Sequence, residues 1–579
     1  MPRGGRVFLA RVLTLLLAAA VLTCAAAYPR ANTVPIGTTT SESAERDAII
    51  NEARAVFQPT TLKANSRRVV DGTPKYKRRA MRDIDLSTDG AEAGSTPFRV
   101  QIACPSSTAD ALCARMEKAA SLALRRIGKV LNLRTTVTVG MAFFAPCQAT
   151  SINDTKLRSC EQKNILGAAA PAGMQLVRIP ELTPGQNGAF SMLPQPLAPN
   201  AYPPGHEGVF YVPQSLIRQW DVKVTNPAAM ADTDIAAGFN LLRNWWVQGD
   251  SAGMTSDQDD LEYVILHEMM HGLGFGVDSF SNPASTRMII PIADNSTTGN
   301  GDYQFLYPAL WDAFMVDVSA SPPNLARNFS VSSPVPLPSP RPWLNGYGDY
   351  TTTVVQAGKA LNPKNATQLL LDSSAILQLL NKNSSMIKEG TDRYRTATTQ
   401  GSLALAAWPA SEYLPLFANA SVLAPVYQTS GTTWLAFPVD TAYDPFQSGS
   451  SLAHWDQTFA QGPIAAGGTG ASSNFLMASS TLSTLGPRGT LAQGNIPGYN
   501  GTYLRSGIGP ATVAVLRVLG YQVNGMPPRP AWRDIEWVAD EDQQLDMLIS
   551  SSVAPAPGKG ASCVAMVAAA VVTVIGALL

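Results

Sequence analysis

The pentapeptide His267-Glu268-Met269-Met270-His271 constrains this chain of 579 residues more than any other stretch. On an α-helix, residues four positions apart lie on one face, so His267 and His271 can direct ring nitrogens toward one point. That spacing suits one catalytic Zn²⁺, with Zn–N distances of about 2.0–2.1 Å. Glu268 is then placed to act as a general base. The alternative is a core helix with two histidines, but this chain has only 4 histidines, and chance rarely arranges two of them as H-E-x-x-H.

The residues around the pentapeptide predict a buried helix. Ser256 and Asp259 have the spacing of a capping box, which marks a helix start. The following turns are apolar on nearly every face, as in a helix enclosed by other elements. Gly272 and Gly274 can end the helix in a left-handed turn.

Both ends of the chain resemble processing signals. Residues 1–27 combine arginines, a short apolar run and a small-residue cleavage site, which predicts a secretory signal peptide. Residues 526–552 read as a stalk that ends in small residues, and residues 553–579 have the spacer and apolar run of a GPI-attachment signal. A tail anchor is the alternative, although no Lys or Arg follows the apolar run. We expect passage through the secretory pathway and attachment to the membrane by a GPI lipid at the extracellular face.

Cysteines and glycosylation sequons agree with an oxidising, secreted environment. Cys24 and Cys563 fall in the processed ends, which leaves four cysteines for two disulfides. Three connectivities are possible, and we favour the local pairs Cys104–Cys113 and Cys147–Cys160. The sequons that suggest N-glycosylation are at Asn153, Asn295, Asn328, Asn365, Asn383, Asn419 and Asn500. The formal net charge is +0, so nothing indicates a nucleic-acid partner.

The region before the pentapeptide mixes strands and helices. Residues 28–95 are polar and contain Lys77-Arg78-Arg79, so they read either as a propeptide cut after Arg79 or as a disordered linker. Residues 96–281 are expected to form an N-terminal catalytic subdomain in which a twisted sheet carries packed helices. Hydrophobic spacing predicts strands at 98–103, 134–144, 175–179 and 209–212, and helices at 109–131 and 234–247.

The region after the pentapeptide divides into two parts. Residues 282–449 are rich in Pro, Asn, Ser and Thr, and we interpret them as a glycosylated insertion or a separate small domain. Short helices are expected there at 304–318 and 366–381. Residues 450–525 are expected to form a C-terminal catalytic subdomain.

A catalytic zinc needs a third protein ligand. The compact pattern HExxHxxGxxH would place a histidine at position 277, where this chain has Val277. The candidates that remain are His206, His454 and a carboxylate, either Asp278 or Asp392. His206 reads as a loop residue.

The sequence around His454 carries a resemblance to a known family. His454 is followed by Trp455 and Asp456, then by the pair Leu476-Met477, and residues 508–521 end in Leu-Gly-Tyr. Together with Gly274 and Phe275 after the pentapeptide, this order resembles the leishmanolysin-like branch of the metzincin zinc peptidases. The long interval between His271 and His454 and the low cysteine content make the chain a divergent member.

The resemblance implies an α+β fold with a twisted mixed sheet, a zinc helix, a large insertion and a mostly irregular or helical C-terminal subdomain. It implies one zinc ion held by His267, His271 and His454, with Met477 in a Met-turn beneath the site. An edge strand would hold an extended peptide. Asp456 could orient His454, or could be an exposed loop residue.

We therefore expect a cell-surface zinc endopeptidase that acts on peptide or protein substrates. One alternative is a catalytically inactive, GPI-anchored surface or adhesion protein with the same fold. Another is a zinc hydrolase with a carboxylate as third ligand.

Overall fold

The structure is a computed structural model. It describes residues 49–50, 53–54, 76–78, 82–84, 97–105, 110–144, 165–182, 201, 207–220, 230–250, 254–255, 257–276, 279–282, 287–291, 293–294, 304–305, 307–319, 335–336, 341–352, 384–417, 426–429, 432–447, 450–461, 474–478, 507–528, 532 and 535–537. All of them belong to one compact unit, residues 40–550. Residues 1–39 and 551–579 form the second unit and lie outside the described residues.

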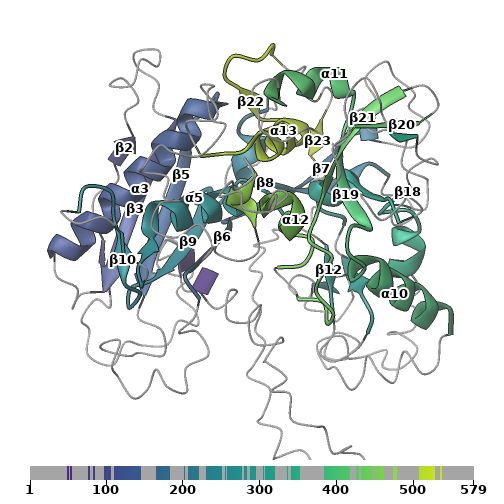
Figure 1. Cartoon of the computed structure of the whole chain (residues 1–579), viewed down its shortest axis with the longest axis horizontal. Helices are drawn as coiled ribbons and strands as arrows, with labels where there is room; N and C mark the ends of the chain where they lie inside the picture. The colour runs from purple at the N-terminus through teal and green to yellow at the C-terminus, as the bar shows by residue number, and fades with distance from the viewer. Residues whose placement is uncertain are drawn as a thin grey trace, which may run out of the picture. The chain divides into compact units, whose positions relative to one another are not determined.

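A mixed sheet forms the first half of the unit (Figure 1). Its central strands are parallel: β3 Phe98–Pro105, β5 Val137–Phe144 and β9 Ile235–Asn240. β6 Gly167–Pro171 runs antiparallel to β9 at one side. On the other side, β1 Tyr76–Arg78 and β2 Arg82–Ile84 both pair antiparallel with β3. The expected sheet is therefore present, and the fold is α+β.

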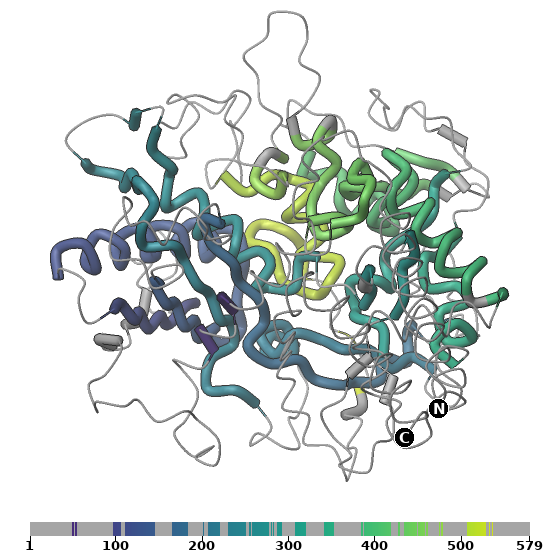
Figure 2. Tube along the Cα trace, turned by 90° about the horizontal axis from the view of Figure 1, so that it is seen from below, coloured from purple at the N-terminus to yellow at the C-terminus, as the bar shows by residue number. Residues whose placement is uncertain are grey.

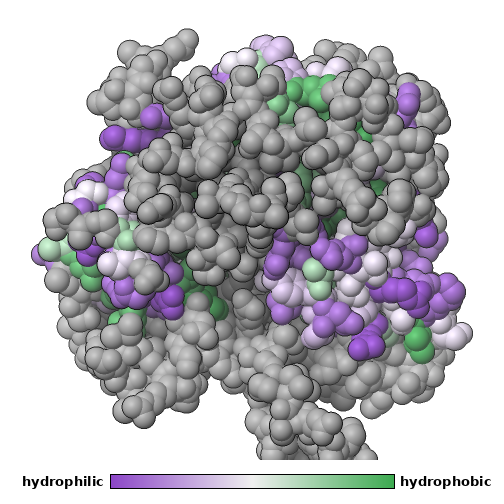
Figure 3. Space-filling view, viewed as in Figure 1, coloured by the Kyte–Doolittle hydropathy of each residue, from purple (hydrophilic) through white to green (hydrophobic). Residues whose placement is uncertain are grey.

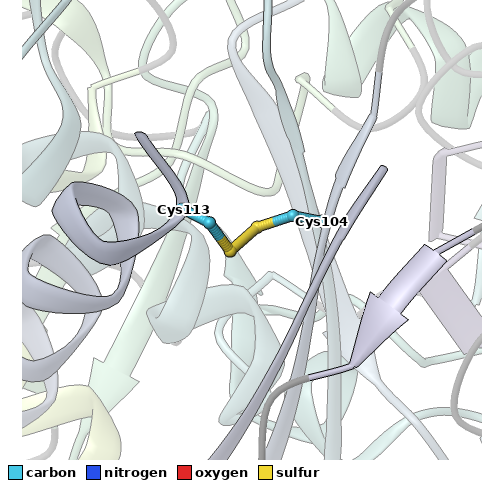
Figure 4. Close-up of a disulfide and its surroundings, with 2 residues drawn as sticks. All are labelled: Cys104 and Cys113. Atoms are coloured by element: carbon cyan, nitrogen blue, oxygen red, sulfur yellow. A yellow bond between two sulfur atoms is a disulfide. The ribbon is translucent and has the colours of Figure 1, made fainter. Parts of the chain in front are cut away.

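Two helices cover one face of this sheet. α3 Asp110–Val130 places an apolar row on the sheet, and α5 Leu261–Gly272, which carries the pentapeptide, lies against α3 and β6. Their buried side chains join those of β3, β5 and β9 in one core. Cys104 at the end of β3 forms a disulfide with Cys113 in the first turn of α3 (Figure 4).

The helix expected at residues 234–247 is wrong. That stretch forms β9 and β10 Trp245–Trp246. All six residues of β9 are buried, because the strand lies between β5 and β6 with both faces covered. Such a strand reads as a continuous apolar run, and this one is rich in Ala and Gly, so periodicity cannot separate it from a buried helix.

Residues 282–449, interpreted above as an insertion or a separate small domain, contribute a second sheet. The strands, in spatial order, are β17 Val335–Pro336, β20 Val426–Thr429, β21 Thr432–Pro438, β19 Leu403–Ala407, β16 Met315–Asp317 and β18 Arg341–Pro342. Leu405 and Phe437 of this sheet share the main core with α5. The single helix expected at 304–318 is wrong, since β15 Gln304–Phe305, α6 Leu310–Ala313 and β16 divide that stretch. The helix expected at 366–381 lies outside the described residues.

α10 Ser384–Ala397 lies beside the second sheet, and its outer face carries charged residues (Figure 3). α13 Pro510–Leu519 packs on β19 and leads into β22 Gln522–Val523, which pairs with β4 Leu131–Asn132 after α3. Figure 2 shows this yellow segment between the blue and green parts of the chain. The C-terminal segment therefore connects the two sheets.

The remaining elements are short. They are β7 Met174–Arg178, β8 Val209–Pro213, β11 Asp259–Asp260, β12 Phe280–Ser281, β13 Ile290–Pro291, β14 Ala293–Asp294, β23 Glu536–Trp537, α4 Gln214–Ile217, α11 Ala410–Tyr413, α12 Gln457–Gln461 and the 3₁₀ turns Pro180–Leu182, Leu414–Phe417 and Phe475–Met477.

Several sequence predictions lie outside the described residues. They concern both processing signals, His206, Asp278 and the pair Cys147–Cys160, and all of the sequons: Asn153, Asn295, Asn328, Asn365, Asn383, Asn419 and Asn500. Among the helices that the structure describes, none has the length and apolar character needed to cross a membrane.

Candidate metal centre

The helix that carries the pentapeptide begins at a different residue from the one predicted. Asp260 is the N-cap of α5, and its carboxylate accepts the backbone N–H of Tyr263. Asp259 belongs to β11, so it does not complete a capping box, and Ser256 lies outside the described residues. Burial, followed by repulsion from Glu262, raises the pKa of Asp260 from 3.8 to about 7.

Of the two glycines predicted to end the helix in a left-handed turn, Gly274 does so, whereas Gly272 is the last helical residue. Gly274 has a φ of +101° and Gly276 a φ of +73°, so the chain turns sharply after α5. A Cβ on Gly276 would lie 2.6 Å from the Cα of Ala453. Glycine at this position therefore lets the residue before His454 approach the end of the helix.

The structure brings His267, His271 and His454 together. One ring nitrogen from each lies within 4.8 Å of the others. The Nε2 atoms of His267 and His454 are 3.2 Å apart. Two nitrogens bound to one tetrahedral zinc at about 2.0–2.1 Å would be about 3.3–3.4 Å apart. The spacing of this pair therefore fits a shared zinc ion.

Backbone carbonyls orient the three imidazoles. Assigning a proton to each Nδ1 lets His267 donate to the Leu476 carbonyl at 2.5 Å. His271 donates to the Phe275 carbonyl, and His454 to the Ser450 carbonyl, both at 2.9 Å. This tautomer leaves a lone pair on every Nε2, as a metal ligand requires. Two such lone pairs facing each other across 3.2 Å repel unless a proton or a metal ion lies between them, so the three histidines are a donor set that could hold a metal ion such as Zn²⁺.

His454 is held by the second sheet and by the 3₁₀ turn Phe475–Met477. The N–H of Asp440, just after β21, donates to the His454 carbonyl, and Leu452 N–H donates to Asp440. Leu452 has a φ of +66°, a conformation that costs a non-glycine residue energy and tends to occur at functional sites. Trp455 N–H donates to the Met477 carbonyl. Met477 is fully buried in the 3₁₀ turn Phe475–Met477.

An aromatic cluster packs behind the histidines. Trp455 is fully buried, with its ring centroid 4.8 Å from Phe275 and 5.9 Å from Phe437. Its indole N–H donates to the Thr512 hydroxyl of α13. The residue after His454 thereby contacts the end of α5, the second sheet and the C-terminal helix, which explains how a distant histidine reaches the site.

Glu268 lies against the edge of the first sheet. It is buried, and its carboxylate accepts the backbone N–H of Ala169 in β6 at 3.0 Å. Hydrogen bonds from Ala172 to Asp234 and from Asn240 to Leu166 pair the even-numbered residues of β6 with β9. Gly167 and Ala169 therefore direct their backbone groups away from β9. No other described strand pairs with that side of β6.

The other sequence candidates have different surroundings. Asp456 is buried, so the exposed-loop interpretation is wrong, and it accepts the N–H of Phe459 at the start of α12. Asp392 lies on α10 and pairs with Lys388, a hydrogen bond that lowers the pKa of Asp392. Among the described residues, the three histidines are the one group of side chains close enough together to hold a metal ion.

Sequence reasoning missed the backbone groups of the site. The carbonyls of Leu476, Phe275 and Ser450 leave no sequence signal, since any residue type can supply them. β6 was also missed, because Gly-Ala-Ala-Ala-Pro lacks the β-branched residues that mark a strand. Asn474 was missed as well; it precedes the 3₁₀ turn Phe475–Met477, and its side chain accepts the N–H of Ala511 at the start of α13.

Comparison with known proteins finds limited similarity. A family model described as SPBPB7E8-like matches residues 207–301, which include α5 but not His454. The chain is also similar to a fission yeast protein (Schizosaccharomyces pombe) named "Uncharacterized protein PB7E8.01", with 23% identity over 431 residues. The matched region covers 72% of this chain and 60% of the relative, so the chain spans about three fifths of that protein's length. No solved structure matches this chain.

Proposed function

We propose that this chain is a zinc-dependent endopeptidase, a divergent relative of the leishmanolysin-like metzincins. The observation that supports the proposal best is the proximity of the His454, His267 and His271 rings, next to the buried residue Glu268. A zinc site with a purely structural role has no need of that carboxylate. The mixed sheet with an antiparallel edge strand next to the histidine-bearing helix also agrees with this proposal.

In the proposed reaction, His267, His271 and His454 hold one Zn²⁺ through their Nε2 atoms. When bound, zinc supplies Lewis-acid polarisation of the substrate carbonyl and lowers the pKa of water in the site. Glu268 takes a proton from the attacking water and delivers it to the amine of the leaving peptide. The hydrogen bond from Ala169 N–H holds the Glu268 carboxylate at the edge of β6 that faces away from β9.

The outward-facing edge of β6 supplies the proposed peptide-binding surface. An extended peptide can pair with the backbone of Gly167 and with the carbonyl of Ala169, whose N–H is already donated to Glu268, as a strand added to a sheet edge does. Because Ala169 N–H is the donor to Glu268, a peptide on this edge would place its backbone next to the general base. Recognition through backbone groups implies an endopeptidase that accepts chains of varied sequence.

The test is Glu268→Gln in the full chain. We expect one zinc per molecule in both proteins, measured by elemental analysis, and loss of peptide-library cleavage in the variant by about 10²-fold or more. Glu412→Gln makes the same chemical change on α11, outside the site, and is expected to retain wild-type cleavage. Equal cleavage by Glu268→Gln would exclude the proposed general base. Zinc-loaded wild-type protein without cleavage would instead favour the inactive surface protein.

A further inference from the structure

The polar N-terminal region supplies a buried layer on the back of the first sheet. Ile49 and Ile50 pack with Phe144, Ile165 and Ala168 on the face opposite α3 and α5. Ala53 packs with Ala103, Ala142 and Ala236, and it is fully buried. The disordered-linker interpretation is therefore wrong for these residues.

The sheet is shaped to accept this layer. A Cβ on Gly238 of β9 would lie 2.4 Å from the Cγ2 atom of Ile49. Alanine is the side chain at the neighbouring back-face positions 142, 168 and 236. Small residues on this face leave room for the N-terminal segment, and removing it would expose a row of buried apolar side chains to water.

Arg54 connects this layer to β6, the strand that binds Glu268. Arg54 is 5% exposed, and its Nη2 donates to the carbonyl of Pro171 at 2.7 Å. Pro171 is the last residue of β6, two positions from the Ala169 N–H that binds Glu268. Arg54 therefore fixes the end of the strand whose backbone positions the proposed general base.

The basic sequence that would direct propeptide removal also belongs to the sheet. Lys77 and Arg78 of β1 pair with Cys104 and Ala103 of β3, and β2 pairs with β3 further along. A processing protease binds its substrate as an extended strand, so cleavage here requires β1 to leave the sheet first. Arg79 lies outside the described residues.

From these contacts we infer that the segment carrying Ile49–Arg54, β1 and β2 is a permanent part of the mature protein and not a removable propeptide. Arg54 is a positioning residue that acts on Glu268 through β6. The first statement holds whatever the reaction is, whereas the role of Arg54 rests on the proposed function.

The first experiment identifies what remains bound in the secreted protein. The full chain is expressed in a eukaryotic secretory host, purified by gel filtration without denaturant and examined by intact mass and N-terminal peptide mapping. We expect peptides containing Ile49–Arg54 in equimolar amount, either on the intact chain or on a fragment that only denaturant releases. A folded, zinc-binding protein that begins at residue 80 or later, with no such fragment, would overturn the inference.

The second experiment tests Arg54 itself. We expect Arg54→Ala to keep one zinc per molecule while kcat falls about 10–100-fold, because a small displacement of a reacting group has an effect of that size. Arg54→Lys, which retains a donor, should recover part of the loss. A change in KM alone, or wild-type kcat in folded Arg54→Ala, would contradict the positioning role.

Arg393→Ala is the matched control. Arg393 is also 5% exposed, and it donates to the carbonyls of Trp343 and Asn345, not to β6. We expect it to lower the melting temperature without lowering kcat at a temperature where both variants are folded. If Arg54→Ala does not fold, the kcat of Arg54→Lys relative to Arg393→Lys decides the same point. If Glu268→Gln proves fully active, the proposed function fails, and the mass measurement still decides whether the segment is retained.

Discussion

Replacing Asp260 with Asn is expected to stabilise the protein above neutral pH. Asp260 is 8% exposed, and burial and the neighbouring Glu262 raise its pKa from 3.8 to about 7. Between these two values the folded state binds more protons than the unfolded state, so stability falls as the pH rises from about 4 to about 7. Above pH 7 the carboxylate is charged in both states, and its full burial cost is present.

The size of the effect follows from the pKa shift. At 1.36 kcal/mol per unit, the shift corresponds to at most about 4 kcal/mol at pH 8. Asn keeps the cap, because its Oδ1 can still accept the Tyr263 N–H, and Asn and Asp cap helices equally well. The variant loses about 0.3–1 kcal/mol of attraction to the helix dipole, while the attraction to Arg126 is already included in the pKa shift. We expect a net gain of about 1–3 kcal/mol at pH 8.

Urea unfolding measures this difference in free energy of unfolding between wild type and Asp260→Asn. The experiment is done at pH 4.5 and pH 8, with a chelator present so that zinc release does not contribute. The gain should appear at pH 8 and be small at pH 4.5. Asp259→Asn is the control, since that carboxylate is more exposed and pairs with Arg243. It should lose less than about 1 kcal/mol. A variant of Asp260 that is less stable than wild type at pH 8 would refute the reasoning.

Three further changes test other parts of the structure. Gly276→Ala should destabilise the fold by about 1–3 kcal/mol and weaken zinc binding in a competition assay, because its Cβ would lie 2.6 Å from the Cα of Ala453. Gly346→Ala is the control, since Gly346 has a similar φ of +79° but no neighbour closer than 3.8 Å to the added Cβ. Equal losses of stability in the two variants would contradict the close approach of Ala453. Replacing both Cys104 and Cys113 with Ala should cost about 2–4 kcal/mol in urea unfolding, and no loss would contradict the disulfide. Trp455→Ala should cost about 3–5 kcal/mol and reduce zinc occupancy, whereas full occupancy in the folded variant would show that the aromatic cluster does not hold His454.

Much of the site could be predicted because its ligands carry local patterns. The helical spacing of His267 and His271 depends on five consecutive residues, and the turn at Gly274 follows from backbone sterics. The resemblance drew attention to His454, but its approach depends on contacts between distant segments, such as Gly276 with Ala453 and Trp455 with Phe275. Spacing along the chain contains no information about such contacts.

The errors have physical reasons as well. β9 was predicted as a helix, since buried Ala and Gly satisfy either structure, and tertiary pairing with β5 and β6 decides between them. The second sheet was missed because its strands are short and come from widely separated residues. Ile49 and Ala53 lie in a polar stretch, so composition suggested disorder, although a few apolar side chains are enough to anchor the segment to the sheet.

Zinc stoichiometry of His454→Ala is the most direct test of the central claim that the distant His454 joins His267 and His271 in binding one catalytic ion. Elemental analysis after dialysis against buffered zinc should give one zinc per wild-type molecule and less than about one tenth of that in the variant, because two histidines alone bind zinc far more weakly than three. His206→Ala, which replaces the remaining histidine of the chain, should retain the wild-type value. Full zinc occupancy in folded His454→Ala would contradict the account.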